Sequence, residues 1–215
     1  LKQSDLVGDK KQYFDTIDLS EITHLKVDIY PDGGIARFKA FGEICFDEKL
    51  FEETNINVLS MKNGARAVYA NNEFFGLLRN ILKDNEAINM GDGWETRRRR
   101  EPGNDWGIIE LASPAIIDNI MIDTNFFKGN FADSFSICSA YLENTTDSSV
   151  VTQSMFWEEL IPAKKLQMHK KHYFQNNELL HNKPITHIRI NIFPDGGVSR
   201  LKLFGKFIKT KDLKD

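Results

Sequence analysis

Apolar and polar residues alternate along much of the chain, which is the pattern of half-buried β-strands. The alternation is regular over residues 25–30 and again over residues 188–193. Each run is followed by Pro-Asp-Gly-Gly, which supplies one fixed φ and two residues free to adopt a positive φ, and then by a second alternating run. These patterns predict one β-hairpin near the beginning of the chain and another at its end.

The rest of the chain also favours short strands. Residues 71–82 are the main exception, because their apolar positions suit a helical turn or two, and the polar stretch 143–154 is typical of a loop. Short strands punctuated by Gly, Pro and Asn predict an all-β fold, an antiparallel β-sandwich or jelly roll. Strands are expected at 64–70, 105–112, 115–123 and 134–142, with Ser113-Pro114 separating the second from the third, and shorter pieces around 156–157 and 172–174.

One phrase of twenty residues occurs twice. Residues 23–42 and 186–205 share eleven identities, and their offset of 163 residues is far longer than the period of a solenoid repeat. The pattern therefore indicates a duplicated domain that ends with this phrase. On this interpretation, residues 1–45 are the C-terminal remnant of a first repeat, the acidic segment 46–57 is a linker, and residues 58–215 form a complete second repeat.

Composition narrows the possible partners. The net charge is −3, with basic residues balanced by acidic ones, which argues against a nucleic-acid partner. No apolar run approaches the roughly 18 residues that a membrane-spanning helix needs, so no membrane partner is expected. Cys45 and Cys138 lack metal-site spacing, so we expect buried free thiols and a cytoplasmic protein. The five histidines show no zinc spacing, and nucleotide-binding motifs are absent from the sequence, so we expect no metal and no cofactor.

Charge and tryptophan concentrate in residues 91–107, GDGWETRRRREPGNDWG, which turn-forming dipeptides mark as a loop. One interpretation is a solvated charged loop in which Trp94 and Trp106 close the end of the sandwich. The other is an anion site, because the guanidinium of Arg97 or Arg98 can hold a carboxylate by two parallel hydrogen bonds. The acidic residues of the same loop would then supply an acid or a base.

A second polar segment, residues 123–131 (DTNFFKGNF), follows a predicted strand. It is interpreted either as a turn that seats its phenylalanines in the core, or as part of a site. Loops at one end of a sandwich often converge, which would bring Asp123, Lys128 and Asn130 near the first loop. His187 is equivalent to His24 in the first copy of the repeated phrase. Because each precedes a predicted strand, we interpret His187 as fixing the start of that strand.

Taken together, these motifs resemble the allantoicase family, whose members hydrolyse allantoate to ureidoglycolate and urea. The family is built from two tandem jelly-roll repeats of the galactose-binding-like type. The resemblance therefore implies one complete repeat, preceded by the C-terminal hairpin of a repeat that this chain mostly lacks. The segments that carry it are 92–98 (DGWETRR), 105–106 (DW), 123–130 (DTNFFKGN), 194–197 (PDGG) and the earlier PDGG at 31–34.

The resemblance implies allantoate as a small-molecule substrate, in purine and allantoin degradation. Allantoate is a carboxylate that bears two ureido groups on one carbon, so a site for it needs a cation, amide-type partners and an acid–base pair around the departing urea. In this assignment Trp94 also walls off water. We assign catalysis to Asp92, Glu95 and His187, and substrate binding to Trp94, Arg97, Arg98, Asp123 and Asn130.

Two other outcomes are compatible with the same core residues. A galactose-binding-like module that binds a ligand without catalysis, or an inactive member of the family, would keep the same scaffold. Release of urea from allantoate by the full-length protein distinguishes an enzyme from such a module. For the enzyme, we expect a homo-oligomer.

Overall fold

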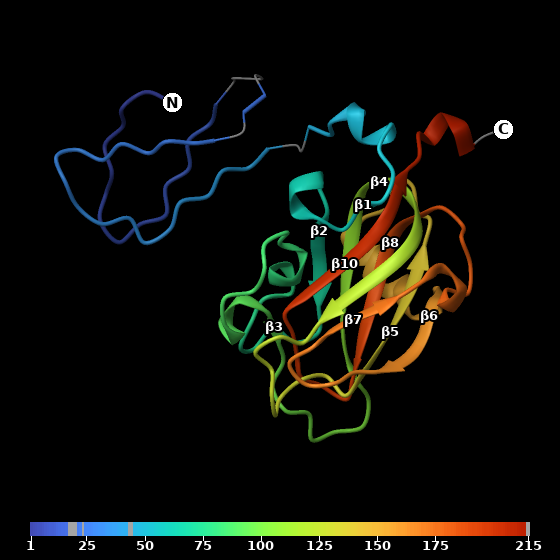
Figure 1. Cartoon of the computed structure of the whole chain (residues 1–215). Helices are drawn as coiled ribbons and strands as arrows, with labels where there is room; N and C mark the ends of the chain where they lie inside the picture. Colours follow the sequence, from blue (N-terminus) through green and yellow to red (C-terminus); the bar gives the residue numbers. More distant parts are fainter. Residues whose placement is uncertain (17–20, 23, 43–44, 214–215) are drawn as a thin grey trace. The chain divides into compact units, whose positions relative to one another are not determined.

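The computed structural model describes residues 1–16, 21–22, 24–42 and 45–213 (Figure 1). The chain divides into two compact units, Leu1–Cys45 and Phe46–Asp215. Among the described residues, every helix and strand belongs to the second unit.

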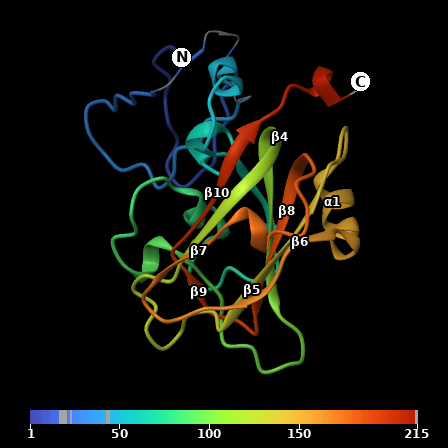
Figure 2. The ribbon, with the colours of Figure 1, turned by 45° about the vertical axis from the view of Figure 1, so that its right-hand side comes forward.

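The second unit is an antiparallel β-sandwich in which two sheets share one long strand, β4 (Asp105–Asp123). The first sheet has the order β2-β4-β8-β5-β6 and the second has the order β1-β10-β4-β7. Figures 1 and 2 show these sheets as two layers. The predicted all-β antiparallel sandwich is confirmed. The other strands are β1 (Ile56–Asn57), β2 (Arg66–Ala70), β3 (Trp94–Glu95), β5 (Ser134–Ala140), β6 (Glu158–Lys165), β7 (Lys171–Phe174), β8 (Ile185–Phe193), β9 (Gly197–Val198) and β10 (Arg200–Phe207).

Strand β4 runs unbroken through Ser113-Pro114, where the sequence predicted a break between two strands. Residues 105–110 pair with β8, residues 115–123 pair with β10, and the register with β8 shifts between these halves. Proline has no N–H to donate to a ladder, so it is tolerated where a strand changes partner. Pro114 therefore marks a corner between the two sheets and not a turn.

The pairing predicted for the C-terminal hairpin is wrong, although both of its strands form. β8 lies between β4 and β5, whereas β10 lies between β4 and β1. The Pro-Asp-Gly-Gly turn thus carries the chain from one sheet to the other. Gly196 has a φ of 129°, in the left-handed region that favours glycine. The two strands do not pair with each other because the long β4 gives each of them a partner in a different sheet.

The first copy of the repeated phrase does not form the predicted hairpin. No strand is assigned among the described residues of the first unit, although Gly33 has a φ of 136°, close to that of its counterpart in the second copy. Leu25 is 55% exposed, whereas its counterpart Ile188 is fully buried between partner strands. An alternating sequence needs neighbouring strands to bury its apolar face, and an isolated two-stranded hairpin is marginal in water. The assignment of residues 1–45 to a preceding repeat stays a prediction.

The segment 46–57, expected to be a linker, belongs to the second unit and packs against its core. It contains the 3₁₀ helix η1 (Glu48–Phe51) and the strand β1, which pairs with β10. The ring of Phe46 lies 4.9 Å from that of Phe51 and 5.0 Å from that of Phe207. Both phenylalanines of the segment are partly buried against the core, a placement that its acidic composition did not indicate.

The remaining helical turns follow the sequence unevenly. The turn expected in 71–82 forms as η3 (Leu78–Leu82), whose apolar residues are buried, while Phe74 stays exposed. The predicted loop 143–154 instead contains helix α1 (Asp147–Gln153), because the Thr146 side chain accepts a hydrogen bond from the amide of Ser149 and caps it. The other 3₁₀ turns are η2 (Met61–Asn63), η4 (Met90–Asp92), η5 (Ser154–Phe156), η6 (Asn176–Glu178) and η7 (Thr210–Leu213).

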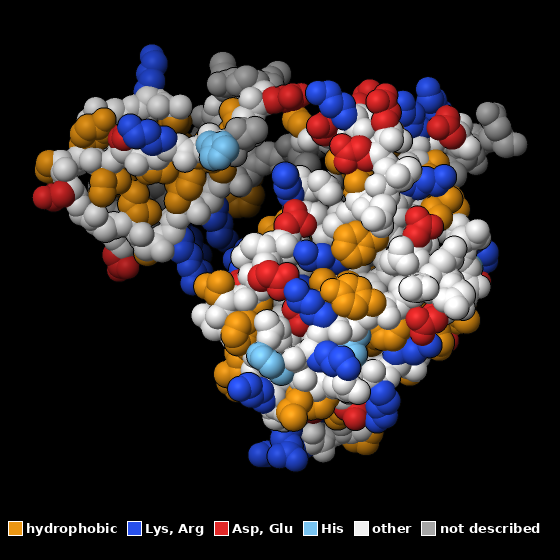
Figure 3. Space-filling view, in the orientation of Figure 1, with side chains coloured by type: hydrophobic (Ala, Val, Ile, Leu, Met, Phe, Trp, Pro, Cys, Tyr) orange, Lys and Arg blue, Asp and Glu red, His pale blue; other side chains and the backbone are white. Residues whose placement is uncertain are grey.

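The distribution of surface charge and the burial of the two cysteines can be compared with the predictions from sequence. Lys/Arg and Asp/Glu side chains are interspersed on the visible face of the second unit (Figure 3). Cys45 and Cys138 are free, as predicted, but Cys45 is exposed and Cys138 half-buried, so the expected burial is wrong for Cys45. Within the described parts of the chain, no helix is long and apolar enough to cross a membrane.

Candidate functional site

Three motifs that lie far apart in the sequence meet at one end of the sandwich. β3 pairs antiparallel with β9, and the amide of Gly197 donates to the carbonyl oxygen of Asn130 at 2.7 Å. The amide of Thr96 donates to Gly196 O at 3.2 Å, and the amide of Gly196 donates to Thr96 Oγ1 at 3.0 Å. Figures 1 and 2 place the loops that follow β3 and β4 at the same end. The Pro-Asp-Gly-Gly turn therefore positions the other two motifs.

Glu95 and Asn130 form the central polar pair of this end. Asn130 Nδ2 donates to Glu95 Oε1 at 2.5 Å, which joins two of the motifs through their side chains. The backbone of Glu95 is fixed as well, because the amides of Phe75 and Gly76 both donate to its carbonyl oxygen at 3.1 Å. Glu95 is half-buried. The result is a carboxylate held in one orientation without being sealed in the core.

An open cavity of about 620 Å³ lies beside Asn130, within the range of small-molecule sites, and Glu95 borders it through its contact with Asn130 without being one of the lining residues. Asn130 belongs to both features, since it lines the cavity and donates to Glu95. The other lining residues combine apolar surface with one lysine and one histidine: Asn89, Met90, Phe126, Lys128, Gly129 and His169.

The two loops that carry most of this lining are tied together. Thr124 Oγ1 donates to the carbonyl oxygen of Gln167 at 2.6 Å and lies 3.1 Å from the amide of Lys170. The amide of Thr124 donates to Lys170 O at 3.0 Å, and the amide of His169 donates to Phe127 O at 3.1 Å. The cavity is therefore framed by backbone that is hydrogen-bonded on both sides.

Asp92 is held in ion pairs below the surface. Its carboxylate is paired with Lys83 and with Arg200, whose Nη2 lies 2.6 Å from Asp92 Oδ2. Burial acts to raise the pKa of Asp92, but the hydrogen bonds and charges of the two cations outweigh it and lower that pKa. A carboxylate fixed in this way is suited to holding the loop and not to exchanging a proton.

The tryptophan and the arginines of the loop lie elsewhere than the cavity. Trp94 is fully buried, and its Nε1 donates to the carbonyl oxygen of Asn72 at 2.9 Å, so it belongs to the core. Arg97 and Arg98 are exposed and are not among the lining residues. Arg99 turns inward, where its Nη1 lies 2.8 Å from the buried Asp105 Oδ1.

Asp123 is buried at the end of β4 and does not line the cavity. Its Oδ1 accepts a hydrogen bond from the amide of Asn125 at 2.8 Å, which fixes the turn that follows. Burial raises the pKa of Asp123, against the opposing effect of that hydrogen bond. The contacts of Asp123 are thus those of a turn residue that hydrogen-bonds locally. Asn130, in contrast, contacts Glu95 of the first loop, as expected if the two loops converge.

His187 lies away from Glu95 and Asn130. It stands opposite Glu110 in the β4–β8 ladder, six residues before β8 ends at Phe193, which corresponds to about 20 Å along a strand. Its Nε2 lies 3.8 Å from Glu110 Oε1 and its Nδ1 lies 2.9 Å from Thr186 Oγ1. Burial lowers the pKa of His187, although the charge of Glu110 acts to raise it. The structure therefore does not bring His187 to the acids of the loop.

His169 lines the cavity and carries a titratable side chain, although the sequence did not single it out as a candidate. Its only sequence signal is weak, because a polar loop between two strands gives no ligand spacing. Within the described residues, no group of three or more His, Cys, Asp and Glu side chains could hold a metal ion.

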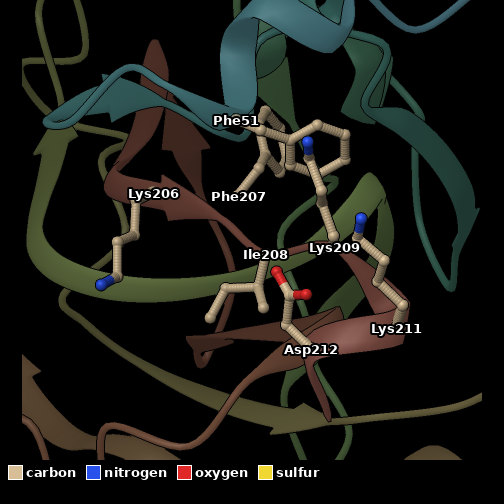
Figure 4. Close-up of a pocket in the computed structure, with 7 residues that line it drawn as sticks. All are labelled: Phe51, Lys206, Phe207, Ile208, Lys209, Lys211 and Asp212. Atoms are coloured by element: carbon tan, nitrogen blue, oxygen red, sulfur yellow. The ribbon is translucent and has the colours of Figure 1, made fainter. Parts of the chain in front are cut away.

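A second hollow, of about 370 Å³, lies where η1 meets the end of β10 (Figure 4). It combines lysines with apolar side chains, and Lys209 Nζ lies 5.3 Å from the centre of the Phe51 ring. None of the predicted site residues lines it. The cavity beside Glu95 and Asn130 is therefore the candidate site.

Comparison with known proteins agrees with the motifs. A family model described as the allantoicase repeat matches residues 1–45 and 56–208. The chain is 50% identical over 201 residues to a protein named "Probable allantoicase" from Ralstonia nicotianae, covering 93% of this chain and 60% of that protein. It is 49% identical over 205 residues to "Probable allantoicase 1" from Burkholderia mallei, covering 95% and 60%.

The fold is also similar to that of a solved relative. The structure of allantoicase from Saccharomyces cerevisiae matches with a TM-score of 0.60 and 30% identity, covering 70% of this chain and 43% of that chain. This similarity confirms the jelly-roll type of fold that the motifs implied. The chain spans about 60% of the length of the curated relatives described above.

Proposed function

We propose, because the chain belongs to the allantoicase family, that the protein of which it forms part hydrolyses allantoate to ureidoglycolate and urea. The observation that carries this proposal is the Glu95–Asn130 pair beside a cavity of small-molecule size. In this reaction water adds to the carbon that bears the carboxylate and the two ureido groups, and one C–N bond breaks. The departing ureido nitrogen gains a proton and leaves as urea.

Glu95 suits the role of general base in this scheme. It takes a proton from the attacking water, and the same proton is then available to the leaving nitrogen, so charge and atoms balance. Asn130 Nδ2 donates a hydrogen bond to Glu95, which fixes the side-chain amide of Asn130. The Oδ1 of that amide is then the acceptor we assign to a ureido N–H. For Asp92 and His187, whose contacts lie in ion pairs and strand packing, we propose structural roles.

Lys128 is the cation we assign to the substrate carboxylate, because it lines the cavity while Arg97 and Arg98 do not. Replacing Lys128 by Met is expected to raise KM for allantoate roughly 10- to 100-fold, the value of a charged hydrogen bond, with kcat little changed. The double replacement of Arg97 and Arg98 by Met serves as the comparison. If KM rises only in the double variant, the carboxylate is held by the arginines as the sequence first indicated, and the assignment to Lys128 is wrong.

The proposed activity is tested by measuring urea released from allantoate, using the protein at the length of its relatives and the 215-residue chain side by side. Release of urea with formation of ureidoglycolate is the expected result for the former. Binding of a ligand with no turnover would instead identify the protein as a non-catalytic module of the same fold.

We further propose that the protein is cytoplasmic, acts without a nucleic-acid or membrane partner, and forms a homo-oligomer. Free thiols and a net charge of −3 support the first two statements. Exposed apolar side chains on the second unit, including Phe74, Phe75 and Ile88, support self-association. Light scattering coupled to size-exclusion chromatography measures the mass, and a monomer at micromolar concentration would contradict the oligomer.

A further inference from the structure

His169 is held at the cavity by backbone on both sides. It lies in the loop between β6 and β7 with a φ of 50°, a conformation that is uncommon for residues other than glycine, although Asn, Asp and His adopt it more often than most. Its own amide donates to the carbonyl oxygen of Phe127 at 3.1 Å. Its ring meets that of Phe126 edge-on, with 5.9 Å between centroids. The position of the imidazole is therefore set by the loop that also carries Lys128 and Asn130.

The contact of the ring with the backbone determines which nitrogen carries the proton. The amide of Phe126 donates to His169 Nδ1 at 2.8 Å, so Nδ1 acts as an acceptor and carries no hydrogen. In a neutral imidazole the proton then resides on Nε2, on the other side of the ring. Because His169 lines the cavity, we infer that this N–H is available there as a donor.

The donor of His169 complements the acceptor of Asn130. A ureido group offers N–H donors and a carbonyl oxygen, and it needs both kinds of partner once it is removed from water. Asn130 Oδ1 provides an acceptor, and the hydrogen bond that Asn130 Nδ2 donates to Glu95 fixes the amide to which it belongs. Four lining side chains carry N–H donors: Asn89, Lys128, Asn130 and His169. Lys128 is assigned to the carboxylate and Asn130 donates to Glu95, while the ring of His169 is held by a backbone hydrogen bond.

We propose that His169 Nε2–H donates to the carbonyl oxygen of the ureido group that leaves as urea. This inference rests on the proposed function, since the ureido ligand comes from that reaction. The hydrogen bond withdraws electron density from the ureido nitrogen as its bond to carbon breaks, so it strengthens toward the transition state. His169 is therefore a substrate-contacting residue that the sequence pattern did not indicate.

The test replaces His169 by Asn. The Asn Oδ1 can accept the hydrogen bond of the Phe126 amide, and Asn tolerates a positive φ, so this variant keeps the loop. The Asn Nδ2 donors stand on a shorter side chain and do not reach the position of the Nε2 donor, which is therefore lost. We expect kcat/KM for allantoate to fall roughly 10- to 100-fold, with the thermal midpoint unchanged. His181→Asn is the matched control, because His181 Nδ1 also accepts a backbone amide, that of Lys183 at 3.3 Å, outside the cavity.

A second readout does not depend on turnover. Long-range ¹H–¹⁵N correlation spectra of the 215-residue chain report which imidazole nitrogen of His169 is protonated, and titration with allantoate or urea should shift the Nε2 resonance. A protonated Nδ1, or unchanged kcat/KM in His169→Asn with an active wild type, overturns this inference and leaves the proposed function intact. A wild-type protein of full length that neither binds nor converts allantoate overturns both.

Discussion

Replacing Arg200 by Met is expected to lower the free energy of unfolding by about 3–5 kcal/mol, the range for removing one partner of a buried ion pair. Arg200 is 1% exposed and lies at the start of β10. Its guanidinium pairs with Asp92 at 2.6 Å and donates to the carbonyl oxygens of Asn85 at 2.7 Å and Asp92 at 2.6 Å. The Met side chain fills similar space but leaves all of these acceptors without their donor.

The effect should depend on pH in a defined direction. The pKa of Asp92 is lowered in the folded protein, so its ion pairs stabilise the fold fully above the pKa of an unfolded Asp, about 3.9. This stabilisation is lost as the pH falls through the lower pKa of the folded state. Arg200→Met removes the ion pair between Arg200 and Asp92 at every pH. The wild type loses the same contribution at acid pH, so the difference in the free energy of unfolding between wild type and variant should narrow there.

Urea denaturation at neutral pH and at pH 3 measures both effects. Lys206→Met is the matched control, since it replaces an exposed cation of the same strand by the same residue. A loss at neutral pH no larger than that of the control would show that the Arg200 network contributes little to the fold.

The alternation of apolar residues predicted the strands of the second unit but not their partners. A period of two identifies a half-buried strand whichever neighbours it has. Whether β8 and β10 pair with each other depends on the length of β4, and that length is hidden by Pro114, which resembles a break in the sequence. The same limit explains the first copy of the phrase, since its alternation is present while the described residues offer it no neighbouring strand.

The motifs in the sequence indicated where the site lies, but they did not indicate which role each of its residues has. Polarity placed Asp92, Glu95 and Arg97 in one loop. In the structure Asp92 is in an ion pair, Glu95 accepts a hydrogen bond from Asn130, and Arg97 is exposed. This sorting depends on where Arg200 and Asn130 lie, which are 108 and 35 residues away in the sequence from their partners. Local residue types carry no information about such partners.

Replacing Glu95 by Gln is expected to reduce kcat for allantoate hydrolysis by about 10²- to 10⁴-fold, the contribution of a general base. Gln can still accept the hydrogen bond that Asn130 Nδ2 gives to Oε1, so the change removes the charge and the basic oxygen while keeping the contact. We therefore expect KM and the thermal midpoint to stay close to those of the wild type. Steady-state kinetics of urea release from the full-length protein provide the measurement.

Two companion variants separate catalysis from loop structure. Glu101→Gln removes an exposed carboxylate from the same loop and should leave kcat unchanged. Asp92→Asn weakens the pairs with Lys83 and Arg200, so it should lower stability more than it lowers the kcat of the folded fraction. If Asp92→Asn abolished turnover while folded and Glu95→Gln did not, the base would be Asp92, and the ion pairs that hold it would have to open during the reaction. The two ion pairs that fix the Asp92 carboxylate, against one side-chain hydrogen bond on the Glu95 carboxylate, favour Glu95 as the base.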